Sequence, residues 1–166
     1  MAILSPDPVD GYLGTLRGRL GEGLVHVERL APRTTVAGAP ARPLPPAIAE
    51  RLQELGIEEL WAHQAEAIDH LRDGTSTVIA TGTASGKSLC YQLPIAEAVA
   101  DPIRPGTALA LFPTKALAQD QLRAFGHLAV PGLVAATYDG DTDTDQRAWA
   151  RRNANVVLTN PEMLHC

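Results

Sequence analysis

The chain has 166 residues, of which 45% are hydrophobic and 20% charged, a size and composition typical of one soluble globular domain. No apolar run approaches the roughly 18 residues of a membrane span, and the segment from Met1 to Asp10 lacks the basic start and apolar core of a signal peptide. The net charge of −5 gives no general support to nucleic-acid binding, so such binding would depend on a few placed groups.

The N-terminal part of the chain, residues 1–46, is predicted to be an extension that ends in a proline-rich arm or linker. Five prolines fall within residues 32–46, and such a composition is typical of linkers and wrapping arms. Apolar residues then recur at helical spacing from Ala47, where a helix is predicted to run to its stop at Gly56. A second helix is predicted over residues 61–71.

Strands and helices are predicted to alternate from residue 76 onward. Pro94 should kink or shorten the first helix after that point, and Gly126 should end the second. Alternation of this kind predicts an α/β fold for residues 47–166, with a parallel sheet covered by helices on both faces and a ligand site at the carboxyl ends of the strands. The strands are expected over 76–80, 107–112, 132–138 and 155–159, and the helices over 87–99, 115–125 and 143–152.

A loop rich in small residues separates the first predicted strand from the helix that follows it, and it ends in Gly-Lys-Ser. Small residues let backbone N–H groups turn around a polyphosphate, and a helix N-terminus adds its own unpaired N–H groups. The Lys87 ammonium is expected at the β- and γ-phosphates, and the Ser88 hydroxyl is expected to hold Mg²⁺. We therefore predict binding of a nucleoside triphosphate. The predicted loop consists of Thr81, Gly82, Thr83, Ala84, Ser85, Gly86, Lys87 and Ser88.

Four segments together resemble the first RecA-like domain of the superfamily 2 DEAD/DEAH-box helicases. Residues 60–68 (Leu-Trp-Ala-His-Gln-Ala-Glu-Ala-Ile) are similar to the Q-motif region, and the loop at 81–88 is similar to the family's phosphate loop. Residues 113–121 (Pro-Thr-Lys-Ala-Leu-Ala-Gln-Asp-Gln) resemble motif Ia, and residues 158–165 (Leu-Thr-Asn-Pro-Glu-Met-Leu-His) resemble motif Ib. Within the family, the residues of these motifs are similar to those of bacterial and fungal 3′-to-5′ DNA helicases linked to crosslink repair.

The resemblance implies a RecA-like P-loop fold and ATP as the nucleotide. It assigns Gln64 to the adenine, because an amide can both donate to and accept from the base. A surface glutamine on an amphipathic helix is the alternative at this position. The loop departs from the usual pattern at Thr81, where glycine is the rule. The two cysteines, Cys90 and Cys166, form no metal-binding pair and favour the reducing cytoplasm.

The resemblance also implies residues that contact nucleic acid. Thr114 and Lys115 begin a helix directly after a strand, which suits contact with a phosphate, and Gln121 could support that contact. Thr159 and Asn160 likewise end a strand before a predicted helix start. Ordinary helix capping is the alternative for Thr114. The implied partner is single-stranded or forked DNA, with RNA left open as the substrate.

Hydrolysis needs an acidic ligand for Mg²⁺ and a base that orients water, which the family supplies as Asp-Glu at the end of an apolar strand. No Asp-Glu pair occurs in the chain. The chain is therefore expected to be the front part of a longer helicase, incomplete at its C-terminus, whose C-terminal remainder is a partner. Residues 1–166 alone are expected to bind ATP weakly without useful hydrolysis, and to leave a sheet edge unpaired that would aggregate or bind a partner.

Two other functions remain open from the sequence. The first is a small P-loop phosphotransferase, in which Asp139, at the end of the predicted strand 132–138, would bind Mg²⁺. The second is a non-catalytic remnant that binds nucleotide or a partner, which the lack of catalytic acids favours for this chain. Lid or acceptor-site patterns that would support the phosphotransferase are not found in the sequence.

Overall fold

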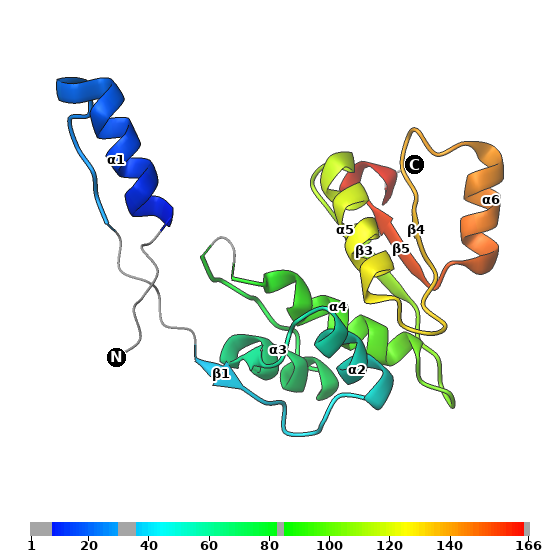
Figure 1. Cartoon of the computed structure of the whole chain (residues 1–166). Helices are drawn as coiled ribbons and strands as arrows, with labels where there is room; N and C mark the ends of the chain where they lie inside the picture. The colour runs from blue at the N-terminus through cyan, green and yellow to red at the C-terminus, as the bar shows by residue number, and fades with distance from the viewer. Residues whose placement is uncertain (1–7, 30–35, 83–84, 165–166) are drawn as a thin grey trace. The chain divides into compact units, whose positions relative to one another are not determined.

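The computed structural model describes residues 8–29, 36–82 and 85–164 of the chain. The chain forms two compact units, residues 1–34 and residues 35–166 (Figure 1). None of the described helices is long and apolar enough to cross a membrane.

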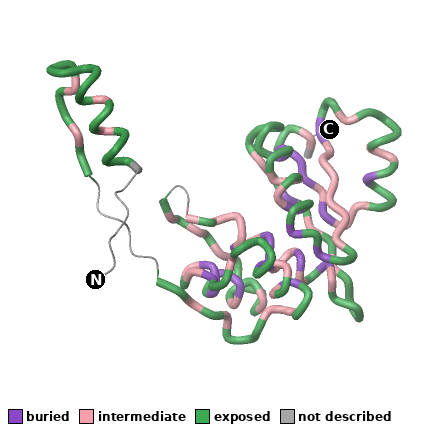
Figure 2. The backbone as a smooth tube through the Cα atoms, in the orientation of Figure 1, coloured by how far each residue is buried: buried purple, intermediate pink, exposed green. Residues whose placement is uncertain are grey.

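The first unit contains a helix that the sequence pattern does not predict. Helix α1 (Pro8–Leu20) is followed by a short 3-10 turn, η1 (Gly21–Gly23). The described side chains of α1 are exposed or half-buried (Figure 2). Arg29 forms an ion pair with Asp10 and so joins the chain beyond η1 to the first turn of the helix.

The second unit begins with a short antiparallel pairing of β1 (Ala37–Gly38) with β2 (Leu60–Trp61). A Cβ atom at Gly38 would lie only 2.6 Å from the Cα atom of Ala62, so this close approach requires glycine. The described part of the proline-rich segment, residues 36–46, is thereby joined to the second unit. The division between the two compact units precedes this segment, and a domain boundary after residue 46 stays a prediction.

Three predicted helices are confirmed with small changes in their bounds: α2 (Pro46–Glu54), α3 (Ala62–Arg72) and α4 (Lys87–Val99). Pro46 occupies the first turn of α2, where a missing N–H group breaks no helical hydrogen bond. Helix α3 packs along α4 (Figure 1). Pro94 lies inside α4 without shortening it, because the helix continues to Val99.

The larger sheet of the second unit has three parallel strands (Figure 1), and their order is β3-β5-β4. They are β3 (Ala108–Leu111), β4 (Ala135–Thr137) and β5 (Val156–Thr159), each within a predicted strand. The register pairs Ala108 and Ala135 with Val156. Parallel strands require crossover connections, which the intervening helices supply.

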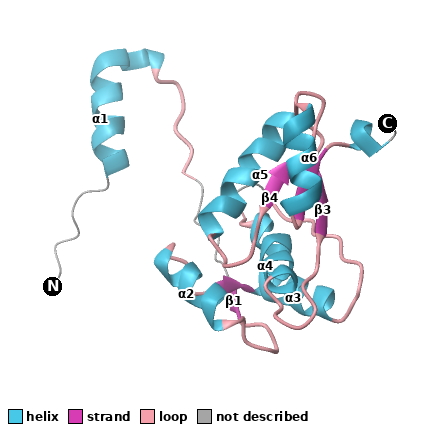
Figure 3. Ribbon diagram, turned by 90° about the vertical axis from the view of Figure 1, so that its right-hand side faces the viewer, coloured by secondary structure: helices cyan, strands magenta, loops and turns pink. Residues whose placement is uncertain are grey.

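Two helices and a short turn complete the unit. Helix α5 (Lys115–Leu128) packs along β4 and β5, and α6 (Thr144–Asn153) links them in the chain (Figure 3). The 3-10 turn η2 (Pro161–Leu164) follows β5. The predicted stop of α5 at Gly126 is wrong, because the helix continues to Leu128 and ends where Ala129 adopts a left-handed conformation. Glycine lowers helix propensity by about 1 kcal/mol, which the buried Leu128 offsets here.

The hydrophobic core lies where the helices meet one face of the sheet (Figure 2). Val156 and Leu158 of β5 are fully buried and share a cluster with Phe125 of α5 and with residues of α4. Burial of one such side chain contributes about 1.5–3 kcal/mol. The alternate residues of β3, Leu109 and Leu111, remain exposed. Helices therefore cover the core face of the sheet, whereas the described residues leave its opposite face exposed at β3.

The predicted strand over residues 76–80 does not form. Residues 75–80 have no regular secondary structure, and the side chain of Val78 is 94% exposed. An extended segment becomes a strand only when a neighbour pairs with its backbone groups, and none of the described strands pairs with this one. The local apolar pattern favours a strand, but the described chain supplies no partner for it.

Candidate functional site

The predicted phosphate loop connects residues 75–80 to α4. Its described part consists of Thr81, Gly82 and residues 85–88, and the predicted loop residues Thr83 and Ala84 lie outside the described residues. Gly86 has a φ of 64°, a left-handed conformation that glycine adopts without strain. The helix begins at the next residue, Lys87, so its N-terminus follows the loop directly, which is the arrangement that anion sites at helix N-termini require.

The loop is closed on itself by its own polar groups. Lys87 Nζ donates hydrogen bonds to the carbonyl oxygens of Thr81, at 2.8 Å, and Gly82, at 2.6 Å. The hydroxyls of Thr81 and Ser85 lie 2.6 Å apart, and the Ser85 hydroxyl also donates to the Gly82 carbonyl at 2.9 Å. A polyphosphate entering this loop must therefore replace the carbonyl oxygens that now accept from Lys87.

Helix α3 braces the loop through two side chains. Gln64 Nε2 donates to the Gly86 carbonyl at 2.9 Å, while Gln64 Oε1 accepts from the Trp61 N–H at 2.8 Å. His63 Nε2 donates to the Ser85 carbonyl at 3.0 Å. Gln64 is only 3% exposed, so its interpretation as a surface residue is wrong. Gln64 is the third residue of α3, and a glutamine at this position is a capping signal that is visible in the sequence. Its contact with adenine stays a prediction.

The first turn of α4 carries the remaining nucleotide-binding candidate, Ser88. This residue is half-buried and hydrogen-bonds to Tyr91, whose pKa is raised mainly by burial and lowered to a lesser extent by that bond. Cys90 behind it is fully buried, and burial raises the pKa of its thiol, as expected for an inert core cysteine. Among the described residues no cluster of three or more His, Cys, Asp or Glu side chains could hold a metal ion. The role of Ser88 as a Mg²⁺ ligand stays a prediction.

The substitution Gly86→Ala is expected to lower ATP affinity more than tenfold and to destabilise the fold by about 1–2 kcal/mol. The added Cβ atom would lie 2.5 Å from Gln64 Nε2, in a left-handed conformation that alanine avoids. Gly74→Ala is a matched control, because Gly74 has a similar φ of 73° but no atom within 4 Å of its Cβ position. Calorimetric titration with Mg·ATP and thermal unfolding measure both effects. Equal losses of ATP affinity in the two variants would contradict this role of Gly86.

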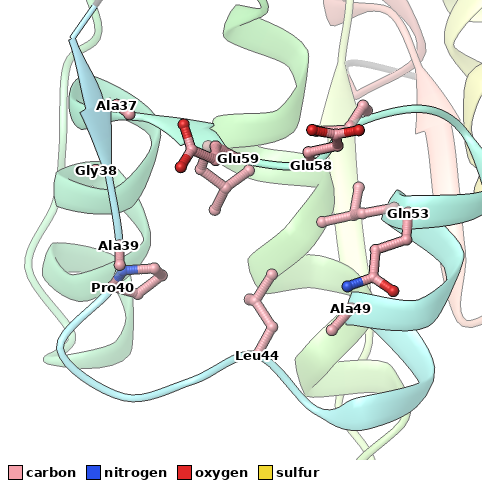
Figure 4. Close-up of a pocket in the computed structure, with 12 residues that line it drawn as sticks. Ala37, Gly38, Ala39, Pro40, Leu44, Ala49, Gln53, Glu58 and Glu59 are labelled. Atoms are coloured by element: carbon pink, nitrogen blue, oxygen red, sulfur yellow. The ribbon is translucent and has the colours of Figure 1, made fainter.

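Two hollows lie beside the elements that hold the loop. One, of about 250 Å³, is lined by residues 77–81 and by His63, Glu66 and His70 of α3. The other, of about 460 Å³, lies between β1, α2 and residues 57–60 (Figure 4). In Figure 4, Leu44 points into it from the segment that joins β1 to α2, across from Glu58 and Glu59. None of the described loop residues lines the second hollow, whereas Thr81 lines the first.

Lys115 and Thr114 lie together at the N-terminus of α5, on the exposed surface at the carboxyl end of β3. The Thr114 hydroxyl accepts a hydrogen bond from the Leu117 N–H at 3.2 Å, which confirms the capping alternative. Lys115 Nζ donates to Asp141 Oδ2 at 2.6 Å. This hydrogen bond is the main factor that raises the pKa of Lys115, so the ammonium stays charged. Of the predicted nucleic-acid contacts, Lys115 thus presents the one positive charge.

The other predicted nucleic-acid contacts make internal hydrogen bonds. Thr159 is 4% exposed and its hydroxyl donates to the Tyr138 carbonyl at 2.5 Å. Asn160 is 7% exposed, and its side-chain oxygen accepts from the N–H of Met163 at 3.1 Å. Gln121 Oε1 accepts from two α4 side chains, Tyr91 at 2.5 Å and Gln92 at 2.9 Å. The Gln121 side chain is thus engaged with α4 and does not support a contact made by Thr114 and Lys115. Contact of Thr159, Asn160 and Gln121 with nucleic acid stays a prediction.

Asp139 organises the turn that follows β4. It is 6% exposed, and its Oδ1 accepts from the Asp141 N–H at 2.8 Å and from the Thr142 N–H and hydroxyl, both at 3.2 Å. Its neighbours in a small hollow include Lys115 and Thr142, whereas the hollow beside the phosphate loop is lined by other residues. The carboxylate is thus committed to the turn, and the geometry gives no support to Asp139 as the Mg²⁺ ligand of a phosphotransferase.

Two arginines of α6 add a feature that the sequence analysis missed. The guanidinium groups of Arg147 and Arg151 lie 5.3 Å and 6.0 Å from the ring centroid of Tyr138. Arg147 also donates to the carbonyls of Asp139, at 2.9 Å, and Thr142, at 2.8 Å. Their spacing of four residues on one helix face was visible in the sequence, but it did not reveal the tyrosine that they cover.

Comparison with known proteins places this geometry in a family. The family model described as DEAD/DEAH box helicase matches residues 61–166. The chain is 41% identical over 151 residues to "Uncharacterized ATP-dependent helicase YprA" of Bacillus subtilis, covering 87% of the chain and 20% of that protein. It is 47% identical over 122 residues to "ATP-dependent helicase HRQ1" of Saccharomyces cerevisiae, covering 70% of the chain and 11% of that protein.

A solved structure shows the same arrangement. The chain is similar to the DUF1998 helicase MrfA bound to DNA and AMPPNP, with a TM-score of 0.77 and 36% identity over 92% of the chain and 22% of that protein. The chain thus spans about a fifth or less of the length of these relatives. The family match, the parallel sheet and the loop at the N-terminus of α4 lead to one conclusion. The chain belongs to the DEAD/DEAH-box helicases, and its second unit has the fold of their N-terminal RecA-like domain.

Proposed function

We propose that this chain is the ATP-binding part of an ATP-dependent DNA helicase, a nucleic-acid-dependent ATPase. The observation that carries the proposal is the loop before α4, which leads through the left-handed Gly86 into the N-terminus of the helix and holds the Lys87 ammonium against its own carbonyls. Relatives named as DNA helicases, such as Hel308 of Pyrococcus abyssi at 39% identity over 113 residues, support DNA as the partner. A role in DNA repair and a cytoplasmic location are further proposals, based on the resemblance of the motifs.

The residues of the loop divide the binding of Mg·ATP among them. Lys87 exchanges its two loop carbonyls for β- and γ-phosphate oxygens, and the N–H groups of the first turn of α4 donate to the same phosphates. Ser88 holds the Mg²⁺ ion that accompanies the nucleotide. Gln64 recognises the adenine with an amide that now braces Gly86 and caps α3, so this contact requires a change of partners.

Hydrolysis of ATP needs acidic side chains that the family supplies as an Asp-Glu pair. An acidic Mg²⁺ ligand and a water-orienting base are required, and no Asp-Glu pair occurs in the sequence. We propose that further segments of the helicase contribute these groups, in keeping with the small share of its relatives that the chain spans. The part described here would then bind ATP and present Lys115 to the nucleic acid.

Direct binding to oligonucleotides tests the proposal. A fluorescently labelled single strand, prepared as DNA and as RNA of the same sequence, is titrated with the protein at several salt concentrations. We expect binding to the DNA strand, weakened about threefold to tenfold by Lys115→Ala, with a salt slope reduced by at most about 0.7 because one phosphate contact is lost. Lys87→Ala is the control, since it removes the chain's other lysine and should leave nucleotide-free DNA binding unchanged. Absence of DNA binding at low salt would refute the proposal, and clear preference for RNA would redirect it to RNA.

A further inference from the structure

The Lys115 side chain, the proposed phosphate contact, already has an anionic partner. Lys115 Nζ lies 2.6 Å from Asp141 Oδ2. Asp141 follows β4, and its backbone N–H is fixed by the Asp139 carboxylate at 2.8 Å. The chain passes close to the ammonium just before Asp141, since a Cβ atom at Gly140 would lie 3.6 Å from Lys115 Nζ. The turn therefore places the Asp141 backbone beside the lysine.

The charges around Lys115 oppose a second anion. Besides Asp141, the carboxylates of Asp139 and Glu162 act on the lysine through their charges. The hollow at this point is lined by one cation, Lys115, and by two carboxylates, those of Asp139 and Asp141. A phosphate that approaches this hollow therefore meets net negative charge. It gains the full electrostatic attraction of the Lys115 ammonium only when a carboxylate moves away.

Asp141 is the carboxylate that is free to withdraw. Its side chain is 79% exposed and that of Lys115 is 44% exposed, and such exposed pairs are weak enough to exchange partners readily. Asp139 differs, because it is buried and its carboxylate accepts the hydrogen bonds of the turn. Its charge therefore stays in place when nucleic acid binds.

We propose that Asp141 competes with a nucleic-acid phosphate for Lys115 and so limits the affinity and the salt dependence of strand binding. This inference rests on the proposed function, in which Lys115 meets a phosphate. Asp141 acts through Lys115 and is a positioning residue. In the free protein it holds the ammonium at the surface of the hollow. On binding, the phosphate replaces it, and the released carboxylate attracts a cation from solution, which offsets part of the counterion release from the nucleic acid.

The charge-removing substitution Asp141→Asn tests the proposal, with a labelled single-stranded DNA as the probe. We expect the affinity at low salt to rise about twofold to fivefold, the range set by the strength of an exposed ion pair. The plot of log K against log salt should steepen by up to about 0.7, since the Lys115–phosphate contact then releases counterions without compensation. A purely structural role of Asp141 would change the affinity without changing this slope.

Asp145→Asn is the matched control. Asp145 belongs to the same acidic segment and is exposed in the first turn of α6, but Lys115 is not its partner. It should raise the affinity less and leave the slope unchanged. In a Lys115→Ala background, the gain from Asp141→Asn should fall to that of Asp145→Asn. Equal gains from the two substitutions in the native background, or a gain from Asp141→Asn that persists without Lys115, would overturn the inference. Failure of every variant, and of the native protein, to bind DNA would instead refute the proposed function.

Discussion

Replacement of Lys87 by alanine is expected to weaken the binding of Mg·ATP about 10- to 100-fold. The estimate follows from hydrogen bonds to a charged group, which are worth about 1.5–3 kcal/mol when the partner is a phosphate oxygen. In the free loop the same ammonium bonds to the Thr81 and Gly82 carbonyls, so the side chain already points into the loop. The loop carbonyls can bond to water in its absence, so the fold should lose little stability. Calorimetric titration of the protein with Mg·ATP measures the affinity.

Two further variants make this result specific. Lys115→Ala removes the only other lysine of the chain, at an exposed site on α5, and should leave the affinity for ATP unchanged. Lys87→Arg keeps the charge but replaces a compact ammonium by a planar guanidinium, which fits less well between phosphates, and should restore only part of the affinity. If both lysine-to-alanine variants lost the same ATP affinity, the loop would not be the nucleotide site.

Replacement of Arg72 by alanine is expected to destabilise the second unit by about 2–4 kcal/mol. The side chain of Arg72 is 6% exposed, and its guanidinium donates to both carboxylate oxygens of Glu97 at 2.9 Å. It also donates to the carbonyls of Arg42, at 2.5 Å, and Pro43, at 3.2 Å. Loss of one partner leaves the other charge poorly solvated, which costs about 3–5 kcal/mol for a buried pair and less here because Glu97 is 28% exposed. Urea unfolding followed by circular dichroism measures the change.

An exposed ion pair provides the comparison for Arg72. Arg123 pairs with Asp120 one turn away on α5, and their side chains are 66% and 60% exposed. Arg123→Ala should therefore cost less than about 1 kcal/mol. A similar loss of stability in the two variants would mean that the Arg72 network contributes little beyond its exposed counterpart.

Local patterns in the sequence predicted the regular elements but not their partners. The helical spacing of Ile48 and Leu52 marks α2, and both side chains are buried as a helix face requires. The apolar run at 76–80 gave an equally strong strand pattern, yet it forms no strand, because strand formation depends on a neighbour that the described chain does not provide. Helix α1 escaped prediction because it contains glycines and has little apolar periodicity.

Motifs predict which residues carry the chemistry of the site, but they do not predict the direction of the side chains. Lys87 and Lys115 lie where charged groups can meet phosphates, in the loop and at the N-terminus of α5. Gln121, Thr159 and Asn160 instead satisfy buried or half-buried polar groups of their own fold. Which face of a helix or strand end meets the core depends on contacts between segments distant in sequence, such as Gln121 with Tyr91, and motif spacing does not encode these contacts.

The hydrogen bonds from Arg72 to the proline-rich segment determine which start residue suits an expressed fragment. A start at residue 47, where the helical pattern of the sequence begins, would delete β1 and both carbonyls that Arg72 binds. It would also remove the Ala41 N–H that donates to Asp69 at 2.8 Å. Helix α3 carries Gln64 and His63 to the nucleotide loop. It would then lose its contacts with β1 near its first residue and the backbone partners of Asp69 and Arg72 near its last. An N-terminal border before Val36 keeps that scaffold whole.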